Sequence, residues 1–236
     1  MRFKNSLVEA VLVRRYKRFL ADVTLADGRL ITVHCANPGS MMGLQEPGSR
    51  VFIAPAVNPK AKLSHSWELI EARLPGGQQL VGINTSNPNR LAEEAILAGQ
   101  IPELSGYARL QREVQYGENS RVDFLLTDPA RPPCFVEVKN CHLMRRAGLA
   151  EFPDSVTARG AKHLGELARE VTSGHRAVML FVVQMQAEAF SLAADLDPAY
   201  AHAFAKARSA GVEALAYTCS ISGEEILVNR AIPIQA

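Results

Sequence analysis

Two apolar segments, residues 120–127 and 134–140, constrain the fold of this chain most, because each carries charged side chains inside a hydrophobic pattern. The turn-forming residues Asp-Pro-Ala-Arg-Pro-Pro between them predict two adjacent antiparallel strands. Side chains alternate along a strand, so Glu137 and Lys139 are expected on one face, with Asp123 close by on the neighbouring strand. A buried charge is costly unless it is paired or binds a metal. The segments therefore predict a charged site on a sheet that otherwise forms core.

Metal-assisted phosphodiester hydrolysis is the chemistry that suits these three residues. Asp123 and Glu137 would bind a hard divalent cation, Mg²⁺ or Mn²⁺, which takes one or two carboxylates and keeps several waters. Such an ion lowers the pKa of a bound water, and Lys139 would orient that water or stabilise the transition state. The spacing resembles that of the PD-(D/E)XK nuclease superfamily. The alternative is a structural trio that pins a strand edge, and a match this short does not decide between them.

Composition is that of an ordinary soluble protein, with 47% hydrophobic and 21% charged residues in 236. No apolar run has the length of a membrane span, and the N-terminus has no signal-peptide pattern. The four cysteines are scattered without a CxxC pair, which favours reduced thiols in the cytoplasm over a zinc site. We therefore expect a cytoplasmic protein without membrane contact, and the sequence does not indicate its oligomeric state.

The first third of the chain is basic. Residues 1–80 carry 11 Lys and Arg against 6 Asp and Glu, a net charge of +5, whereas the remainder carries 15 against 18, a net charge of −3. About five short strands without a helix predict a small OB-type barrel over residues 1–85. A basic cluster interleaved with aromatic residues suits phosphate contacts and base stacking. Its members are Arg14, Arg15, Tyr16, Lys17 and Arg18, which could equally be a solvated strand edge.

The loop at residues 34–44 contains Pro, Gly and Asn, which require special backbone geometry. Asn37, Ser40 and exposed backbone NH groups there could bind an anion. The alternative is a loop that only closes the barrel, and both remain open.

Residues 86–236 are expected to form a second domain, a mixed sheet flanked by helices. A helix is predicted from Leu91 to Ala98 with Asn89 as its N-cap. Glu93 or Glu94 would be a third acidic metal ligand, or would only favour the helix dipole. A second helix is predicted to begin at Asp154 and to end near Thr172. It carries a polar face that either meets water or binds phosphate, formed by Arg159, Lys162, His163 and Glu166.

Further elements follow along the chain. Residues 177–185 read as a strand buried on both faces, and residues 198–210 as a helix. Strands are expected at residues 213–220 and 223–230.

Taken together, these motifs resemble the sugar fermentation stimulation protein family over nearly the whole chain. The resemblance rests on His34, Asn37-Pro-Gly-Ser-Met41, Asn89-Arg90, Glu94, Ser120-Arg-Val-Asp-Phe-Leu, Glu137-Val-Lys139, Phe152-Pro-Asp, Thr157, Arg159-Gly and Lys162-His-Leu. The chain departs from the family after Lys139, where Asn-Cys-His replaces a Ser-Val-Thr-like segment.

The resemblance implies an N-terminal OB-like barrel joined to a PD-(D/E)XK-type α/β domain. It also implies nonspecific, phosphate-dominated DNA binding and a regulatory link to sugar (maltose) metabolism. We expect catalysis by Asp123, Glu137 and Lys139, with Glu94 joining the two carboxylates at the metal. A DNA-binding regulator with an idle nuclease fold is the alternative. The expected DNA contacts are Arg14, Arg15, Tyr16, Lys17, Arg18, Asn37, Ser40, Arg121, Arg159, Lys162 and His163.

Overall fold

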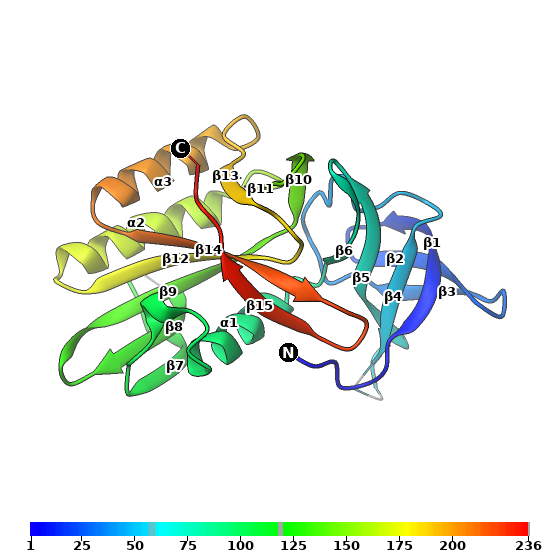
Figure 1. Cartoon of the computed structure of the whole chain (residues 1–236), viewed down its shortest axis with the longest axis horizontal. Coiled ribbons are helices and arrows are strands. Elements are labelled where there is room, and N and C mark those ends of the chain that lie inside the picture. Colours follow the sequence, from blue (N-terminus) through cyan, green and yellow to red (C-terminus); the bar gives the residue numbers. More distant parts are fainter. Residues whose placement is uncertain (57, 59, 118–119, 236) are drawn as a thin grey trace.

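A computed structural model describes residues 1–56, 58, 60–117 and 120–235 (Figure 1). Within these residues, two six-stranded sheets, a three-stranded sheet and three α-helices form a barrel at one end and a helix-flanked sheet at the other. None of the helices in the described ranges is both long enough and apolar enough to cross a membrane. The predicted fold class is confirmed.

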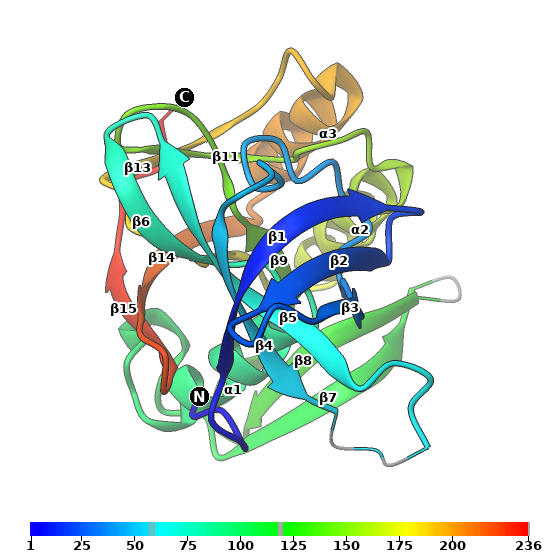
Figure 2. The ribbon, with the colours of Figure 1, turned by 90° about the vertical axis from the view of Figure 1, so that its right-hand side faces the viewer.

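The first sheet is the barrel, which faces the viewer in Figure 2. Its strand order is β3-β2-β1-β4-β5-β6, and a β3–β5 pairing closes the first five strands into the predicted barrel. Gly28 has a φ of +83° in the β2–β3 hairpin, as a tight Asp-Gly turn requires. β6 was not predicted. The strands are β1 (Val8–Tyr16), β2 (Leu20–Leu25), β3 (Leu30–His34), β4 (Arg50–Pro55), β5 (His65–Leu74) and β6 (Gly77–Gly82).

The second six-stranded sheet has the order β15-β14-β12-β9-β8-β7. β8 and β9 are antiparallel neighbours, as predicted, and β12 lies parallel to both β9 and β14. The strands are β7 (Arg109–Tyr116), β8 (Ser120–Asp128), β9 (Arg131–Cys141), β12 (Arg176–Val183), β14 (Glu213–Ile221) and β15 (Ile226–Ala231).

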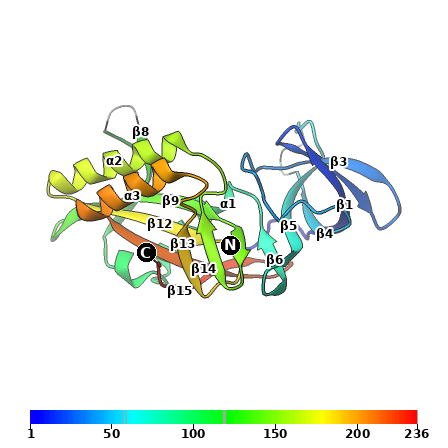
Figure 3. The ribbon, with the colours of Figure 1, turned by 90° about the horizontal axis from the view of Figure 1, so that it is seen from above.

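Helices cover both faces of this sheet (Figure 3). The alternation of β12 shows how: Val178, Leu180 and Val182 pack into the core that contains α1, whereas Met179 and Phe181 pack toward α2 and α3. Glu137 is paired with Met179, so it lies on the α2 side. The helices are α1 (Asn87–Leu97), α2 (Ala158–Thr172) and α3 (Pro198–Ser209), and a 3₁₀ turn spans Pro102–Leu104.

The N-terminal residues pack on the second half of the molecule rather than on the barrel. Met1 is buried in the α1 core, and its amino group donates to the carbonyl oxygen of Ile226 at 2.6 Å. The core on the α2 side is also continuous with the barrel interior, where Trp67 is fully buried. The two halves therefore share apolar packing.

Two predicted helix starts are wrong. Asn89 is not an N-cap, because α1 already begins at Asn87 and its N-cap is Ser86. α2 begins at Ala158 rather than at Asp154, and the Thr157 side chain accepts a hydrogen bond from the Gly160 NH. In both cases a residue type that favours caps has a different partner in the folded chain.

A three-stranded sheet, β10 (Leu143–Arg146), β11 (Leu149–Phe152) and β13 (Ala189–Leu192), was not predicted. Its strands have four residues each, too few to show a period, and β11 pairs in parallel with a strand far along the chain. This sheet carries the chain from the end of β9 to the loop that precedes α2.

Candidate functional site

The charged face of β9 is connected to α2. The Lys139 Nζ lies 2.6 Å from the Glu137 Oε1, so these two side chains share a face as predicted. His163 of α2 forms a short hydrogen bond through its Nδ1 to the same Oε1. The Arg159 Nε donates to the His163 Nε2 at 3.4 Å, which leaves Nδ1 as the protonated nitrogen.

Asp123 on β8 is held by one hydrogen bond at each oxygen. Its Oδ1 accepts from the Asn89 Nδ2 at 2.7 Å, and its Oδ2 accepts from the Val138 NH at 2.7 Å. The pairing of Phe124 with Val136 places Asp123 and Glu137 side by side on neighbouring strands. Burial, and after it the negative charge of Glu137, raises the pKa of Asp123 above its usual value.

Glu137 is buried and only half bonded. Burial alone would raise its pKa, but the hydrogen bond from His163 and the charge of Lys139 lower it below the usual value. Its Oε2 is buried without a hydrogen-bond partner, and so is the hydroxyl of Tyr116 on β7. The ionised Glu137 carboxylate, with one unused buried oxygen, and the adjacent Asp123 carboxylate together form a suitable pair of ligands for a hard cation.

Neither acid of α1 joins this pair. The Glu94 Oε2 lies 2.8 Å from the amino nitrogen of Met1, and its Oε1 accepts from Arg90. Glu93 pairs with Arg112 at 3.1 Å. Among the described residues, no group of three or more His, Cys, Asp or Glu side chains is arranged to hold a metal. The helix contributes Asn89 to the site instead.

The polar face of α2 does not simply meet water. His163 and Glu166 are buried, and both carboxylate oxygens of Glu166 lack a hydrogen bond. The nearest cations to Glu166 are Lys162 at 3.6 Å and Arg169 at 3.7 Å. Of the expected DNA contacts on this helix, Arg159 and Lys162 remain near the surface, whereas His163 lies at Glu137.

The basic cluster divides into held and outward-facing residues. Arg14 pairs with Asp22 at 2.8 Å and lies over the ring of Tyr16. Arg15 donates to the carbonyl oxygens of Asn37 and Gly39 at 2.8 and 3.0 Å. Lys17 and Arg18 are exposed at the tip of the β1–β2 hairpin, and Arg121 is exposed on β8, two residues before Asp123.

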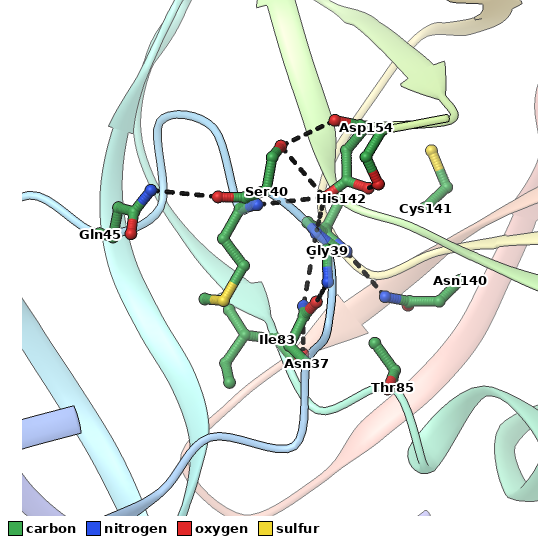
Figure 4. Close-up of polar contacts among 12 residues, drawn as sticks. Asn37, Gly39, Ser40, Gln45, Ile83, Thr85, Asn140, Cys141, His142 and Asp154 are labelled. Atoms are coloured by element: carbon green, nitrogen blue, oxygen red, sulfur yellow. Dashed lines mark hydrogen bonds and ion pairs between the residues drawn. The ribbon is translucent and has the colours of Figure 1, made fainter. Parts of the chain in front are cut away.

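The loop at residues 37–41 joins the barrel to the second half of the molecule, where Asp154 is its main partner (Figure 4). The Ser40 Oγ donates to the Asp154 carbonyl at 2.8 Å, and the Met41 NH donates to the Asp154 Oδ2 at 3.1 Å. A Cβ atom on Gly39 would lie 2.4 Å from that Oδ2, so only glycine permits this approach. The Asn37 Nδ2 donates to the Ile83 carbonyl. Asn37 and Ser40, expected to bind an anion, are thus engaged within the protein.

A chain of hydrogen bonds links β9 to Asp154. The Gln184 Nε2 donates to the Asn140 Oδ1 at 2.7 Å, so the Asn140 Nδ2 donates to the His142 Nδ1, also at 2.7 Å. The proton of His142 is therefore on Nε2, which lies 3.4 Å from the Asp154 Oδ2. Burial would raise the pKa of Asp154, but hydrogen bonds from His142 and Met41 lower it to about 2.

Sequence reasoning missed the site roles of Asn89, Tyr116, His142 and Asp154. Asn89 and Asp154 both belong to the motifs named above, but they were interpreted as helix starts. The residue types marked them as notable, yet the sequence did not indicate which residues they bind. Tyr116 gave no signal, since a single aromatic residue in a strand is usually structural. His142 lay in the Asn-Cys-His segment that departs from the family, but nothing in the sequence indicated its partner.

Comparisons with known proteins agree with this architecture. The model of the sugar fermentation stimulation protein RE domain matches residues 86–225, and that of the N-terminal OB domain of the same family matches residues 13–83. Two relatives described as sugar fermentation stimulation protein homologs come from Methylobacterium nodulans and Azorhizobium caulinodans. They are 58% and 60% identical to this chain, and each alignment covers 99% of both sequences.

A solved structure also resembles the whole chain. It is that of Pyrococcus furiosus SfsA in complex with Ca²⁺, with a TM-score of 0.87 and 26% identity. The match covers 100% of this chain and 98% of that one.

Proposed function

Because the chain belongs to the sugar fermentation stimulation protein family, we propose that it binds DNA without sequence preference and hydrolyses phosphodiester bonds with the help of a divalent cation. The observation that carries the proposal is the buried Glu137 Oε2, which has no hydrogen-bond partner beside the Asp123 carboxylate. The residues present fit a cation, since each Asp123 oxygen accepts only one hydrogen bond and keeps lone-pair capacity. The Ca²⁺ in the related archaeal structure supports the same interpretation.

Asp123 and Glu137 would bind the cation, preferably Mg²⁺ or Mn²⁺. When bound, the ion supplies Lewis acidity and a water of lowered pKa. Asn89 and the Val138 NH fix the Asp123 carboxylate, and His163 fixes that of Glu137, so both acids are preorganised. Lys139 holds its ammonium at the same face, where it orients a water or stabilises negative charge on the phosphate.

DNA contact would combine both halves of the chain, with residues 1–85 as the binding barrel and residues 86–236 as the hydrolytic domain. Lys17 and Arg18 extend from the barrel, and Arg121 shares the strand β8 with Asp123. Arg159 and Lys162 lie on the helix that carries His163. Contacts of this kind neutralise phosphates and do not read bases, so affinity should fall as salt is raised.

A second candidate function is a DNA-binding regulator, linked to sugar metabolism, whose nuclease fold is idle. Two observations favour it. The Lys139 ammonium is already paired with Glu137, and the described residues offer two adjacent carboxylates rather than three at the site. DNA binding is common to both functions.

The test is a cleavage and binding assay on the full chain, with single-stranded, duplex and branched DNA in Mg²⁺, Mn²⁺ or EDTA. The proposal expects cleavage with either cation, none with EDTA, and none from Asp123→Asn, which should still bind DNA. Absence of cleavage under every condition, with binding retained, would overturn the hydrolytic function and leave the regulator.

A further inference from the structure

A recess lies between the barrel and the second half of the molecule, beside the catalytic strand. Its volume is about 720 Å³, within the range of small-molecule pockets. The barrel contributes the loop that contains Pro38, the second half contributes the loop at residues 152–157, and Asn140 of β9 lies in its wall. Asn140 directly follows Lys139, so the recess opens at the end of the strand that carries the site.

The interior of the recess suits a flat, uncharged, hydrogen-bonding group. Thr85, Asn140 and Ser155 donate hydrogen bonds within the protein, but their oxygens keep lone pairs that can accept from a ligand. Phe152 and Val156 offer apolar surface, Val156 being 75% exposed. Asp154 supplies the negative charge of the lining, which disfavours a phosphate in the interior. A nucleobase has the required combination of a π-face and polar edges.

The rim of the recess carries cations. Arg18 lines it from the tip of the β1–β2 hairpin, and Arg15 lines it from β1, where its guanidinium also donates to the Asn37 and Gly39 carbonyls. Lys17 and Arg18 have φ values of +49° and +62°, a left-handed conformation that costs about 1–2 kcal/mol per residue other than glycine. The short β1–β2 turn, whose flanking residues Tyr16 and Leu20 are paired, accommodates this conformation. It places two cations and the adjacent Phe19 ring, 47% exposed, at one tip.

We propose that this recess receives an unpaired nucleobase next to the phosphodiester that is cleaved, with the backbone phosphates on the hairpin cations. A base can enter only when it is out of the duplex stack, since a duplex is too wide for a recess of this volume. The substrate class is therefore single-stranded DNA, or a duplex with an unpaired end or flap. This inference rests on the proposed function and specifies its substrate.

The experiment measures base insertion and strand preference without requiring cleavage. Single-stranded oligonucleotides carry the fluorescent base 2-aminopurine at successive positions, and the full chain is added in EDTA and then in Ca²⁺. The inference expects a fluorescence change at one or two adjacent positions. It also expects affinity for single strands at least about tenfold above that for a blunt duplex, the contribution of about one stacked base.

Filling the recess should remove both effects. Thr85→Tyr adds a ring to the wall, whereas Ser86→Tyr adds the same ring one residue away, at an exposed position outside the lining, and is the matched control. Thr85→Tyr should abolish the local fluorescence change and reduce the single-strand preference at least fivefold, and Ser86→Tyr should keep both. Ser155→Tyr fills the recess from the opposite wall. If thermal unfolding shows that Thr85→Tyr is not folded, the same two measurements are made on Ser155→Tyr instead.

The outcomes separate this inference from the proposed function. Three results would each overturn the proposal that the recess receives an unpaired base. They are equal affinity for a blunt duplex and a single strand, a fluorescence change at every position, and unchanged behaviour of both filled variants. Cleavage of DNA together with such a result would leave the hydrolytic function intact. A local fluorescence change without cleavage in any metal would support base binding in the recess and would overturn the proposed hydrolysis.

Discussion

Two carboxylate–histidine pairs, Glu137 with His163 and Asp154 with His142, differ in how completely the carboxylate is bonded. Asp154 accepts from the Met41 NH and from the hydroxyls of Ser40 and Ser155, and its Oδ2 also lies beside His142. Glu137 uses one oxygen for both Lys139 and His163 and leaves the other buried without a partner.

The difference separates a structural role from a functional one. A buried charge that is fully hydrogen-bonded contributes to the fold, and removal of its bonds costs stability. A buried oxygen without a partner is a cost to the folded state unless something binds it. The comparison therefore assigns the Asp154 pair to the joining of the two halves, and it supports the Glu137 pair as the site of chemistry.

The largest expected effect is on hydrolysis. Lys139→Met keeps most of the apolar stem of the side chain and removes its charge, so single-turnover cleavage should fall about 10²–10³-fold, as for loss of one preorganised group at the transition state. DNA affinity should change little, because one phosphate contact among several is a small part of the electrostatic attraction. Lys206→Met on α3 is the matched control and should cleave as the wild type does. Undiminished cleavage by Lys139→Met would remove this residue from the mechanism.

The next largest expected effect is on cation affinity, which should depend on Glu137 and not on Asp154. Glu137→Gln should weaken Ca²⁺ or Mn²⁺ binding at least about 100-fold, because even loss of an outer partner of a ligand costs 10–100-fold. Asp154→Asn should bind the cation as the wild type does, since the Asp154 oxygens are engaged within the protein. Isothermal titration of both variants tests this prediction. Equal loss of affinity in the two variants would contradict the distinction between the pairs.

The sequence predicted the strand neighbours of Glu137, although not His163, and it predicted none of the partners of Asp154; the reason is physical. Charges that interrupt apolar strands are visible as a local pattern, so Asp123, Glu137 and Lys139 could be brought together from alternation alone. Asp154 and Met41 are 113 positions apart, and no period or spacing relates them. Asn89 shows the same limit, since its type suggested a cap while its true partner, Asp123, lies 34 positions away.

The fold followed the same rule. The barrel strands, the β8–β9 pair and the buried β12 have strong periodic or apolar patterns, and their predictions are confirmed. The sheet of β10, β11 and β13 was missed because its short strands are stabilised by partners distant in the sequence. The placement of Glu94 against the Met1 amino group likewise depends on a tertiary contact that no local pattern encodes.

The joint between the halves should be sensitive to a single methyl group. In Gly39→Ala the new Cβ would lie 2.4 Å from the Asp154 Oδ2, so the loop or the carboxylate must move, at a cost of about 1–3 kcal/mol in the free energy of unfolding. In the background of Asp154→Ala the same substitution should cost clearly less, because the clashing group is gone. Urea unfolding of the four proteins measures the coupling. Strictly additive changes would show that the loop does not depend on Asp154.

The smallest expected effect is a pH-dependent loss of stability in Asp154→Asn. The pKa of Asp154 is lowered to about 2 in the folded protein, against about 3.9 for an unfolded aspartate. A carboxylate whose pKa is depressed by folding stabilises the protein above the unfolded pKa, and that stabilisation is lost as the pH falls through the folded pKa. Asp154 should therefore contribute about 1–2 kcal/mol at pH 7 that fades between about pH 4 and pH 2. The informative measurement is the difference in unfolding free energy between wild type and Asp154→Asn from pH 7 to pH 3, with the exposed Glu224→Gln as control. The difference should be constant down to about pH 5 and shrink below it, while the control stays near zero. A difference that grows as the pH falls would mean that protonated Asp154 is the form the joint prefers, and the assignment of this pair as an ionised structural contact would then be wrong.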